Sequence, residues 1–221
     1  TGNNIGSDLL AKYIGKYGIF IQQAEGANIS GNTIFNIISD NNSLYGISLL
    51  TGVTNAVISE NKIHSLGYNG TDGYGGIGIS ISTGVSNANI LIKNNLIYDI
   101  SGDGFDYFNT FSRNPHGIFL SGDQSGIRIY NNSINLYGNT LNQEDASSTG
   151  ILLGTGSSAE IKNNIIVNNL GLKSGTGYGS YGIYLEDEFS LLEASDNNLI
   201  YVNPTGPGFK FIGFGNYIEC E

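Results

Sequence analysis

The stretch that decides the fold runs from Gly150 to Leu170, with GILL at 150–153, AEIKNNII at 159–166 and VNNL at 167–170. It contains three short apolar segments separated by turns. Each segment is too short for an ordinary helix, and its Ile and Val residues are β-branched, so the stretch predicts three short β-strands. The same arrangement recurs along the chain, and such recurrence predicts a repeat architecture.

The first repeated motif is a glycine followed by isoleucine, any residue and a second aliphatic residue. Its copies begin at Gly18, Gly46, Gly76, Gly117, Gly150 and Gly182. Within each copy the alternation of side chains sends the two aliphatic residues to the same face of a strand, which must then be buried. One coil cannot bury that face alone, so stacking of coils into long parallel sheets is expected.

The second repeated motif is Ile-x-x-Asn-x-Ile, with a degenerate last copy. Its asparagines are Asn32, Asn61, Asn95, Asn132, Asn164 and Asn198. An amide both donates and accepts, and stacked coils repeat at about 4.8 Å, so these residues are expected to form an internal ladder. Asparagine tolerates left-handed backbone, which a tight corner needs, so each ladder residue is expected in that conformation. The alternative is a row of surface ligands, but the flanking isoleucines favour an inward turn.

The sequence therefore predicts an all-β, single-stranded parallel solenoid of about six to seven coils, each of roughly 30 residues with three short strands. We expect one domain over residues 1–221, cut from a longer chain, with a partial first coil at 1–17 and a last coil or cap at 204–221. The single cysteine, Cys220, cannot form an internal disulfide and is expected to have no role.

Composition excludes several classes of protein. The chain of 221 residues has 33 Gly and 3 Pro, too much glycine for long helices. Its net charge of −10 repels phosphate backbones and anionic bilayers, so neither nucleic acid nor membrane is an expected partner. No run approaches the roughly 20 apolar residues of a membrane span.

Several stretches resemble a known family. These are YGI at 17–19, ISGNTI at 29–34 and LIYDISGDG at 96–104, together with the two repeated motifs. They are similar to right-handed parallel β-helix proteins of the pectate-lyase-like superfamily and, more narrowly, to large secreted surface proteins of Bacteroidetes-like bacteria. The resemblance implies a right-handed β-helix located outside the cell or on its surface. Such folds carry lyases, hydrolases, adhesins and phage-tail parts, so function must be argued from sites.

The segments that lead into each Gly-Ile strand vary most in length, chiefly 66–75, 101–116, 137–149 and 171–181. Insertions in a solenoid gather on one rim and commonly build its binding surface. The rim rings expected to bind a ligand are Tyr68, Tyr74, Phe105, Tyr107, Phe108, Tyr178 and Tyr181. Rings beside carboxylates and amides suit a sugar. The alternative is that these rings fold back and seal the rim loops against the coils.

An enzyme remains the alternative function. Outward positions of the Gly-Ile strands offer one carboxylate, Glu186, where acid–base catalysis on a glycan needs a pair. The remaining candidate catalytic set is Asp103, Asp106, Arg113, His116 and Arg128. Its order faintly resembles that of polygalacturonase-type hydrolases, but the two acids are not adjacent and Asp103 to His116 lie in one loop. If catalytic, the chain would be a polysaccharide lyase or a glycoside hydrolase.

No cofactor is expected, since the chain has no His and Cys cluster for zinc. Calcium stays open, because Asp103 and Asp106 supply the start of a set of oxygen ligands. The favoured hypothesis is a secreted, non-catalytic structural or adhesive module. Its expected partners are polysaccharide or cell-surface glycan, held through the rim, and the flanking domains of a longer chain.

Overall fold

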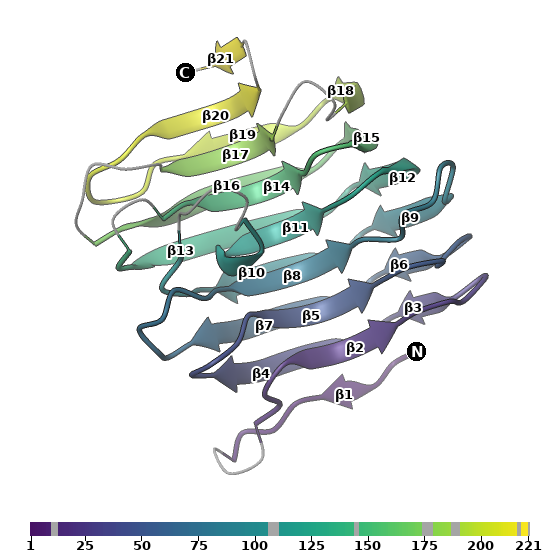
Figure 1. The fold of residues 1–221 in the computed structure, drawn as a ribbon, viewed down its shortest axis with the longest axis horizontal. Coiled ribbons are helices and arrows are strands. Elements are labelled where there is room, and N and C mark those ends of the chain that lie inside the picture. The colour runs from purple at the N-terminus through teal and green to yellow at the C-terminus, as the bar shows by residue number, and fades with distance from the viewer. Residues whose placement is uncertain are drawn as a thin grey trace.

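The computed structural model describes residues 1–9, 13–105, 111–143, 146–173, 179–186, 191–215 and 218–220. It is a parallel β-solenoid in which each full coil contributes one strand to each of three sheets (Figure 1). The predicted all-β fold with three strands per coil is confirmed. Helical structure in the described residues is confined to a 3-10 turn, η2 (Phe111–Arg113).

We number the sheets in the order in which a coil visits them. The first sheet contains β2 (Tyr17–Ile21), β5 (Leu44–Leu49), β8 (Gly76–Ile81), β11 (His116–Leu120), β14 (Ser148–Leu153), β17 (Ser180–Leu185), β20 (Lys210–Gly215) and β21 (Ile218–Cys220). The second sheet contains β3 (Asn28–Ser30), β6 (Val57–Ser59), β9 (Ile90–Lys93), β12 (Gln124–Tyr130), β15 (Ser157–Lys162) and β18 (Leu191–Asp196). The third sheet contains β1 (Asn4–Ile5), β4 (Thr33–Ser39), β7 (Lys62–Tyr68), β10 (Leu96–Ile100), β13 (Ser133–Leu141), β16 (Ile165–Leu172) and β19 (Leu199–Val202).

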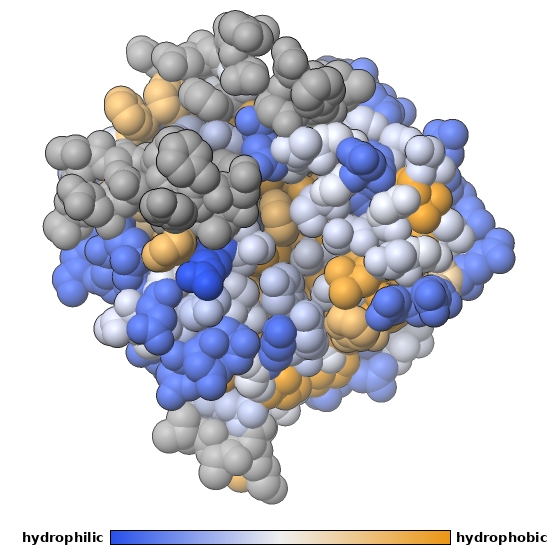
Figure 2. Space-filling model, in the orientation of Figure 1, coloured by the Kyte–Doolittle hydropathy of each residue, from blue (hydrophilic) through white to orange (hydrophobic). Residues whose placement is uncertain are grey.

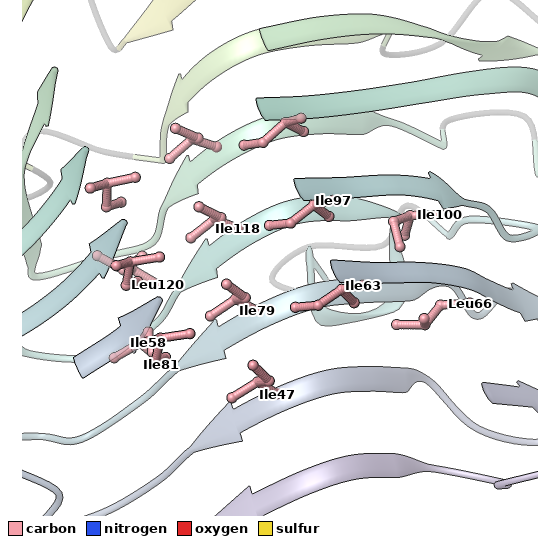
Figure 3. Close-up of a cluster of buried hydrophobic side chains, with 14 of the residues drawn as sticks. Ile47, Ile58, Ile63, Leu66, Ile79, Ile81, Ile97, Ile100, Ile118 and Leu120 are labelled. Carbon is pink, nitrogen blue, oxygen red and sulfur yellow. The ribbon is translucent and has the colours of Figure 1, made fainter. Parts of the chain in front are cut away.

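The pairings between coils are parallel, and the antiparallel pair β20–β21 lies at one edge of the first sheet. Inward side chains stack in columns from coil to coil. On the first sheet Ile47, Ile79 and Ile118 are in register, and on the third sheet Ile63 and Ile97 are. These aliphatic columns fill the space between the sheets and form the core (Figure 3).

The glycine of the first motif is required by a close approach between coils. A Cβ on Gly46 would lie 2.5 Å from the carbonyl oxygen of Gly78, and one on Gly78 would lie 2.6 Å from that of Gly117. The register therefore places Gly78 in the glycine column, and the predicted third copy at Gly76 is wrong by two residues. The cause is local: GIGISI at 76–81 contains two overlapping matches, and only contact with neighbouring coils selects between them.

The predicted asparagines form a continuous hydrogen-bonded column at the corner between the second and third sheets. The backbone N and Nδ2 of Asn95 both donate to Oδ1 of Asn132, at 3.0 and 2.9 Å, and Asn132 donates in the same way to Asn164. The second hydrogen of Asn132 Nδ2 is donated to the carbonyl of Ile92 at 3.0 Å. Asn3 extends the column by donating to Asn32.

The expected left-handed conformation does not belong to the ladder residues. It belongs to the residue before each of them, as at Asn131 (φ 56°) before Asn132 and Glu60 (φ 58°) before Asn61. The tight corner is made by that preceding residue, which points outward. The ladder asparagine keeps an ordinary backbone conformation and can therefore turn its amide into the coil.

Candidate functional site

The rim segments connect the third sheet to the first. In one of them, residues 111–115 lie on the outer side of the first sheet, where η2 is in front of β8 and β11 (Figure 1). The backbone carbonyl of Ser112 accepts a 2.8 Å hydrogen bond from the hydroxyl of Ser43, which directly precedes β5. Gly75 and Gly102 form an antiparallel bridge between neighbouring rim segments. The rim thus packs on the body of the solenoid.

Asp103, the first candidate catalytic acid, is buried in this rim. Its Oδ2 accepts hydrogen bonds from the backbone N of Gly73 at 3.1 Å and from Nε2 of Gln143 at 2.6 Å. Its backbone carbonyl accepts from the N–H groups of Asn142 and Gln143. The residue therefore joins three rim segments, and its carboxylate does not face solvent. Asp106, the second candidate acid, lies outside the described residues.

Arg113 is held between two rim rings. Its guanidinium carbon lies 4.5 Å from the ring centroid of Tyr74 and 4.9 Å from that of Phe105. One guanidinium nitrogen donates to the Tyr74 hydroxyl at 3.3 Å. Such cation–π contacts stabilise a loop. They also place one face of each ring against the guanidinium, so that this face is not open to a ligand.

The remaining two members of the candidate catalytic set are on different sheets. His116 begins β11 and is fully buried on the outer side of the first sheet, where its ring stacks on Phe119 at 5.2 Å. Arg128 lies on β12 of the second sheet and donates a hydrogen bond to Asn89, in an exposed chain of side chains that continues to Asn55. The structure therefore does not bring the four described members of the set together in one cleft.

Four of the seven rings predicted to bind a ligand lie in the part of the chain that the structure describes, and two of these four are enclosed. Tyr68 and Tyr181 are buried, while Tyr74 and Phe105 are occupied by Arg113. The other three, Tyr107, Phe108 and Tyr178, lie outside the described residues. Enclosing an aromatic side chain removes a large apolar area from water. Tyr68 and Tyr181 therefore present no open ring face to solvent, whereas Tyr74 and Phe105 remain partly exposed.

The outer side of the first sheet is a second, smaller apolar core. Its fully or largely buried members are Ile77, Phe119, Leu152, Tyr181, Tyr184 and Phe211. At the edge coil Phe20 is 45% exposed, and apolar areas show as orange on this side of the molecule (Figure 2). Tyr17 stacks on Tyr45 at 5.0 Å, and burial, followed by the charge of Tyr17, raises the pKa of Tyr45 to about 12.

The outer side of the third sheet carries an open row of rings. Phe35, His64 and Tyr98 are in register on β4, β7 and β10. Their ring centroids are 5.7 and 4.8 Å apart, and the interplanar angles are 18° and 10°, so the three rings stack along the solenoid. The ammonium of Lys62 lies 5.7 Å from the Tyr98 centroid. All three rings are partly exposed.

A polar row runs beside these rings because of an unusual backbone. Asn36, Ser65 and Asp99 each follow a ring residue and have φ values of 53°, 55° and 55°. In a regular strand consecutive side chains alternate between faces. The left-handed residue breaks this alternation, so that Phe35 and Asn36 both face solvent while the flanking isoleucines remain buried.

Hydrogen bonds join the polar row to its neighbours. The Ser65 hydroxyl donates to Oδ2 of Asp99 at 2.8 Å and lies 3.1 Å from Nδ1 of His64. Desolvation, followed by the charge of Lys62, lowers the pKa of His64, and Asp99 partly offsets this. Burial, followed by the charge and hydrogen bond of Asp99, raises the pKa of Tyr137. The row therefore offers amide, hydroxyl and carboxylate groups beside aromatic surface.

We call this surface the outer ring face and define it by Phe35, His64, Tyr98, Tyr137 and Tyr201. Tyr137 and Tyr201 are 43% and 51% exposed. Exposed Leu96, Ile165 and Leu199 lie on the same side of the third sheet. Each begins its strand directly before an isoleucine that packs into the core, and this isoleucine is fully buried after Leu96 and Ile165 and partly buried after Leu199.

The sequence carried a signal for this face that the rim hypothesis left unused. Phe35, His64 and Tyr98 each come directly after the second isoleucine of the asparagine motif. A residue next to an inward isoleucine on a strand must face outward. Reading that position coil by coil would have shown rings in register.

Among the described residues, no group of three or more His, Cys, Asp or Glu side chains is placed to hold a metal ion. The same residues include no helix with the length and apolar content of a membrane span.

Comparison with known families gives one match. The model of the right-handed β-helix region matches residues 2–219, which is nearly the whole chain. No curated protein and no solved structure matches the chain. The match agrees with the coil of about 32 residues, the three parallel sheets and the asparagine corner described above. The chain therefore belongs to the right-handed β-helix family.

Proposed function

We propose that this domain is a non-catalytic β-helix module that binds a glycan along the outer ring face. The observation that carries the proposal is the stacked, partly exposed row of Phe35, His64 and Tyr98 beside the polar row of Asn36, Ser65 and Asp99. Sugars present apolar C–H faces and many hydroxyls. A surface that offers rings and hydrogen-bonding groups side by side matches both.

The repeat of the face suits a polymeric ligand. Parallel strands of successive coils lie about 4.8 Å apart, so equivalent groups recur at that interval along the solenoid. A chain ligand laid along the axis can make the same contact on several coils. Many weak contacts on one molecule then add up by multivalency, without any deep pocket.

Charge narrows the class of glycan. The chain carries a net charge of −10, and the polar row beside the outer ring face includes Asp99, with Asp8 close enough to influence His64. A polyanion such as a polyuronate would be repelled at low ionic strength. A neutral polysaccharide is therefore the expected ligand. Because such polymers occur outside cells, we expect the module to work in secreted or surface-bound form.

The enzyme alternative has less support. Asp103 is enclosed by its hydrogen bonds, Arg113 lies between two rings and Arg128 is on another sheet. On the outer ring face Asp99 is engaged by Ser65 and Tyr137 and has no second carboxylate in its own strand. Hydrolysis of a glycosidic bond by the usual route needs two facing carboxyl groups.

The test is affinity electrophoresis through gels that contain a panel of neutral polysaccharides, with polygalacturonate as the anionic comparison. Wild-type protein should be retarded by at least one neutral polymer. Tyr98→Ala should weaken that binding about tenfold, which corresponds to roughly 1.4 kcal/mol. The matched control is Tyr130→Ala, since Tyr130 is a partly buried ring on the second sheet that donates to Glu160. Equal retardation of the two variants, or no retardation of the wild type, would refute the proposal.

A further inference from the structure

The rim holds a buried carboxylate that glycan binding does not use. Asp103 is 2% exposed, and its Oδ2 accepts two hydrogen bonds, from Gly73 and Gln143. Its other oxygen, Oδ1, is buried and has no hydrogen-bond partner among the residues that the structure describes. An oxygen in that state costs free energy unless water or an ion satisfies it.

No described cation neutralises this carboxylate. Within the described part of the chain, the ion pair that meets the 4.0 Å limit joins Lys162 and Glu160. Arg113, ten residues along the same segment, is engaged by Tyr74 and Phe105. Buried charges in proteins are paired or coordinate metals. The missing positive charge therefore points to an ion.

Other oxygens lie close to the Asp103 carboxylate. The Thr71 carbonyl oxygen lies 3.1 Å from Nε2 of Gln143, the same atom that lies 2.6 Å from Asp103 Oδ2. A half-turn of the Gln143 amide exchanges its nitrogen and oxygen, which would place Oε1 between these two oxygens. A second carboxylate is near: after burial, the charges of Asp72 and Asp103 raise the pKa of Tyr68.

We propose that Asp103, the Thr71 carbonyl and the Gln143 side chain form a calcium site that fastens the rim. These are hard oxygen donors of three kinds, and calcium accepts six to eight such ligands in flexible geometry, with water completing the set. Magnesium demands a near-ideal octahedron, which irregular loops supply less readily. With one buried carboxylate in the set, the affinity should be that of weak extracellular sites, about 10⁻⁴–10⁻³ M.

The position of the site explains what the ion would do. Asp103 donates its backbone N–H to the Tyr74 carbonyl at 2.9 Å and accepts from the backbone N–H of Asn142 at 3.0 Å. Three rim segments, at 71–75, 102–105 and 141–143, therefore meet at one residue. An ion at its carboxylate would tie loops that belong to three successive coils.

The experiment follows the melting temperature of chelator-treated protein as calcium chloride is added to about 10 mM, tenfold above the weak end of the expected affinity range. The wild type should gain about 2–5 °C, and magnesium chloride should give a smaller gain. An unchanged melting temperature in calcium would overturn the proposal.

Three variants make the result specific. Asp103→Asn keeps the shape and the acceptor for Gly73 and Gln143 but removes the charge, so it should abolish the calcium response without lowering the chelator-treated melting temperature. Gln143→Glu adds a carboxylate at the same place, so it should lower the chelator-treated melting temperature and enlarge the calcium response. Asp123→Asn removes an exposed carboxylate between β11 and β12 and should respond as the wild type does. A calcium response that Asp103→Asn retains would overturn the proposal.

Discussion

The first and third sheets are built from the same kind of strand, yet their outer faces differ. Both sheets bury aliphatic columns on the inside. On the outside, the first sheet carries Leu152, which is fully buried, whereas the third sheet carries Ile165, which is 47% exposed. Each strand of the first sheet is entered from the rim, and the rim residues 111–115 lie over the outer face of this sheet, where the Ser112 carbonyl accepts a hydrogen bond from Ser43 (Figure 1).

The difference shows that facing outward on a solenoid strand does not mean facing water. The alternation of residues along a strand predicts which face a side chain is on. Whether that face is exposed to solvent depends on the segments that pack over it. The outer face of the first sheet has become a second core, and the outer face of the third sheet remains available to a ligand. The proposed function depends on that contrast, and four measurements would break or sharpen it.

The largest effect is expected from Leu152→Ala. This side chain is enclosed between Phe119 and Tyr184 of the neighbouring coils, so its truncation should cost about 2–5 kcal/mol of unfolding free energy. The comparison variant is Ile165→Ala, which should cost less than about 1 kcal/mol because the side chain is already half exposed. Denaturant unfolding of both variants measures the difference. Equal losses would show that the two outer faces are alike.

The loss of unfolding free energy at the interior asparagine ladder can be compared with the losses on the two outer faces. Asn132→Ala removes a rung that donates to Asn164 and accepts from Asn95, and leaves both neighbours with unpaired groups. The expected loss is about 1–3 kcal/mol. Asn135→Ala removes an exposed amide on the outer side of β13 and should change the unfolding free energy by less than about 0.5 kcal/mol. An unchanged midpoint for Asn132→Ala would show that the column contributes nothing to stability.

Stability at alkaline pH should test whether Tyr45 is buried on the first sheet. The pKa of Tyr45 is raised from 10.0 to about 12, first by burial and then by Tyr17, so the unfolded chain loses this proton before the folded one does. Stability from Tyr45 is therefore complete below about pH 10 and falls as pH rises from there toward 12. Tyr45→Phe keeps the ring and should lose less stability over the same interval, as measured by thermal melts. Parallel pH curves for the two proteins would contradict the burial of Tyr45.

The smallest change in stability is expected in mild acid, where protonation of His64 tests the outer face of the third sheet. The pKa of His64 is lowered from 6.5, first by desolvation and then by Lys62, so the unfolded chain binds a proton more readily than the folded one. Its contribution to stability is present above pH 6.5 and is lost as pH falls below that value. His64→Phe preserves the stack between Phe35 and Tyr98 and should flatten the pH dependence just below neutrality. A steeper dependence in the variant would show that the charged form is favoured in the fold.

Much of the fold could be predicted because it repeats. The isoleucines and the asparagines each recur at fixed places, and a recurring pattern that needs stacking leaves one architecture open. The predicted register of the third coil was wrong because two glycines, Gly76 and Gly78, fit the motif equally well. A Cβ would clash at either position, but only the one on Gly78 would meet the carbonyl of the next coil, as in the rest of the glycine column.

The candidate site was harder to predict because exposure depends on contacts between distant segments. Tyr68 and Tyr181 belong to segments whose composition is typical of a sugar-binding rim, yet tertiary packing buries both side chains. The polar row beside the outer rings requires left-handed residues such as Ser65 and Asp99, and serine in that conformation has no sequence signature. Rings at 35, 64 and 98 were visible in the sequence, but the backbone that opens space beside them was not.

The asparagine column also has a sense of direction. From Asn32 to Asn164, each rung donates its backbone N–H and one Nδ2 hydrogen to the side-chain oxygen of the following rung, which presents that oxygen toward the preceding coil. Two segments of such a solenoid can therefore be joined only if their asparagine columns point in the same direction. In the opposite orientation, two side-chain carbonyls or two N–H groups would face each other at the junction. In a design, coils can be reordered or added, provided that the asparagine of every coil donates its hydrogen bonds in the same direction.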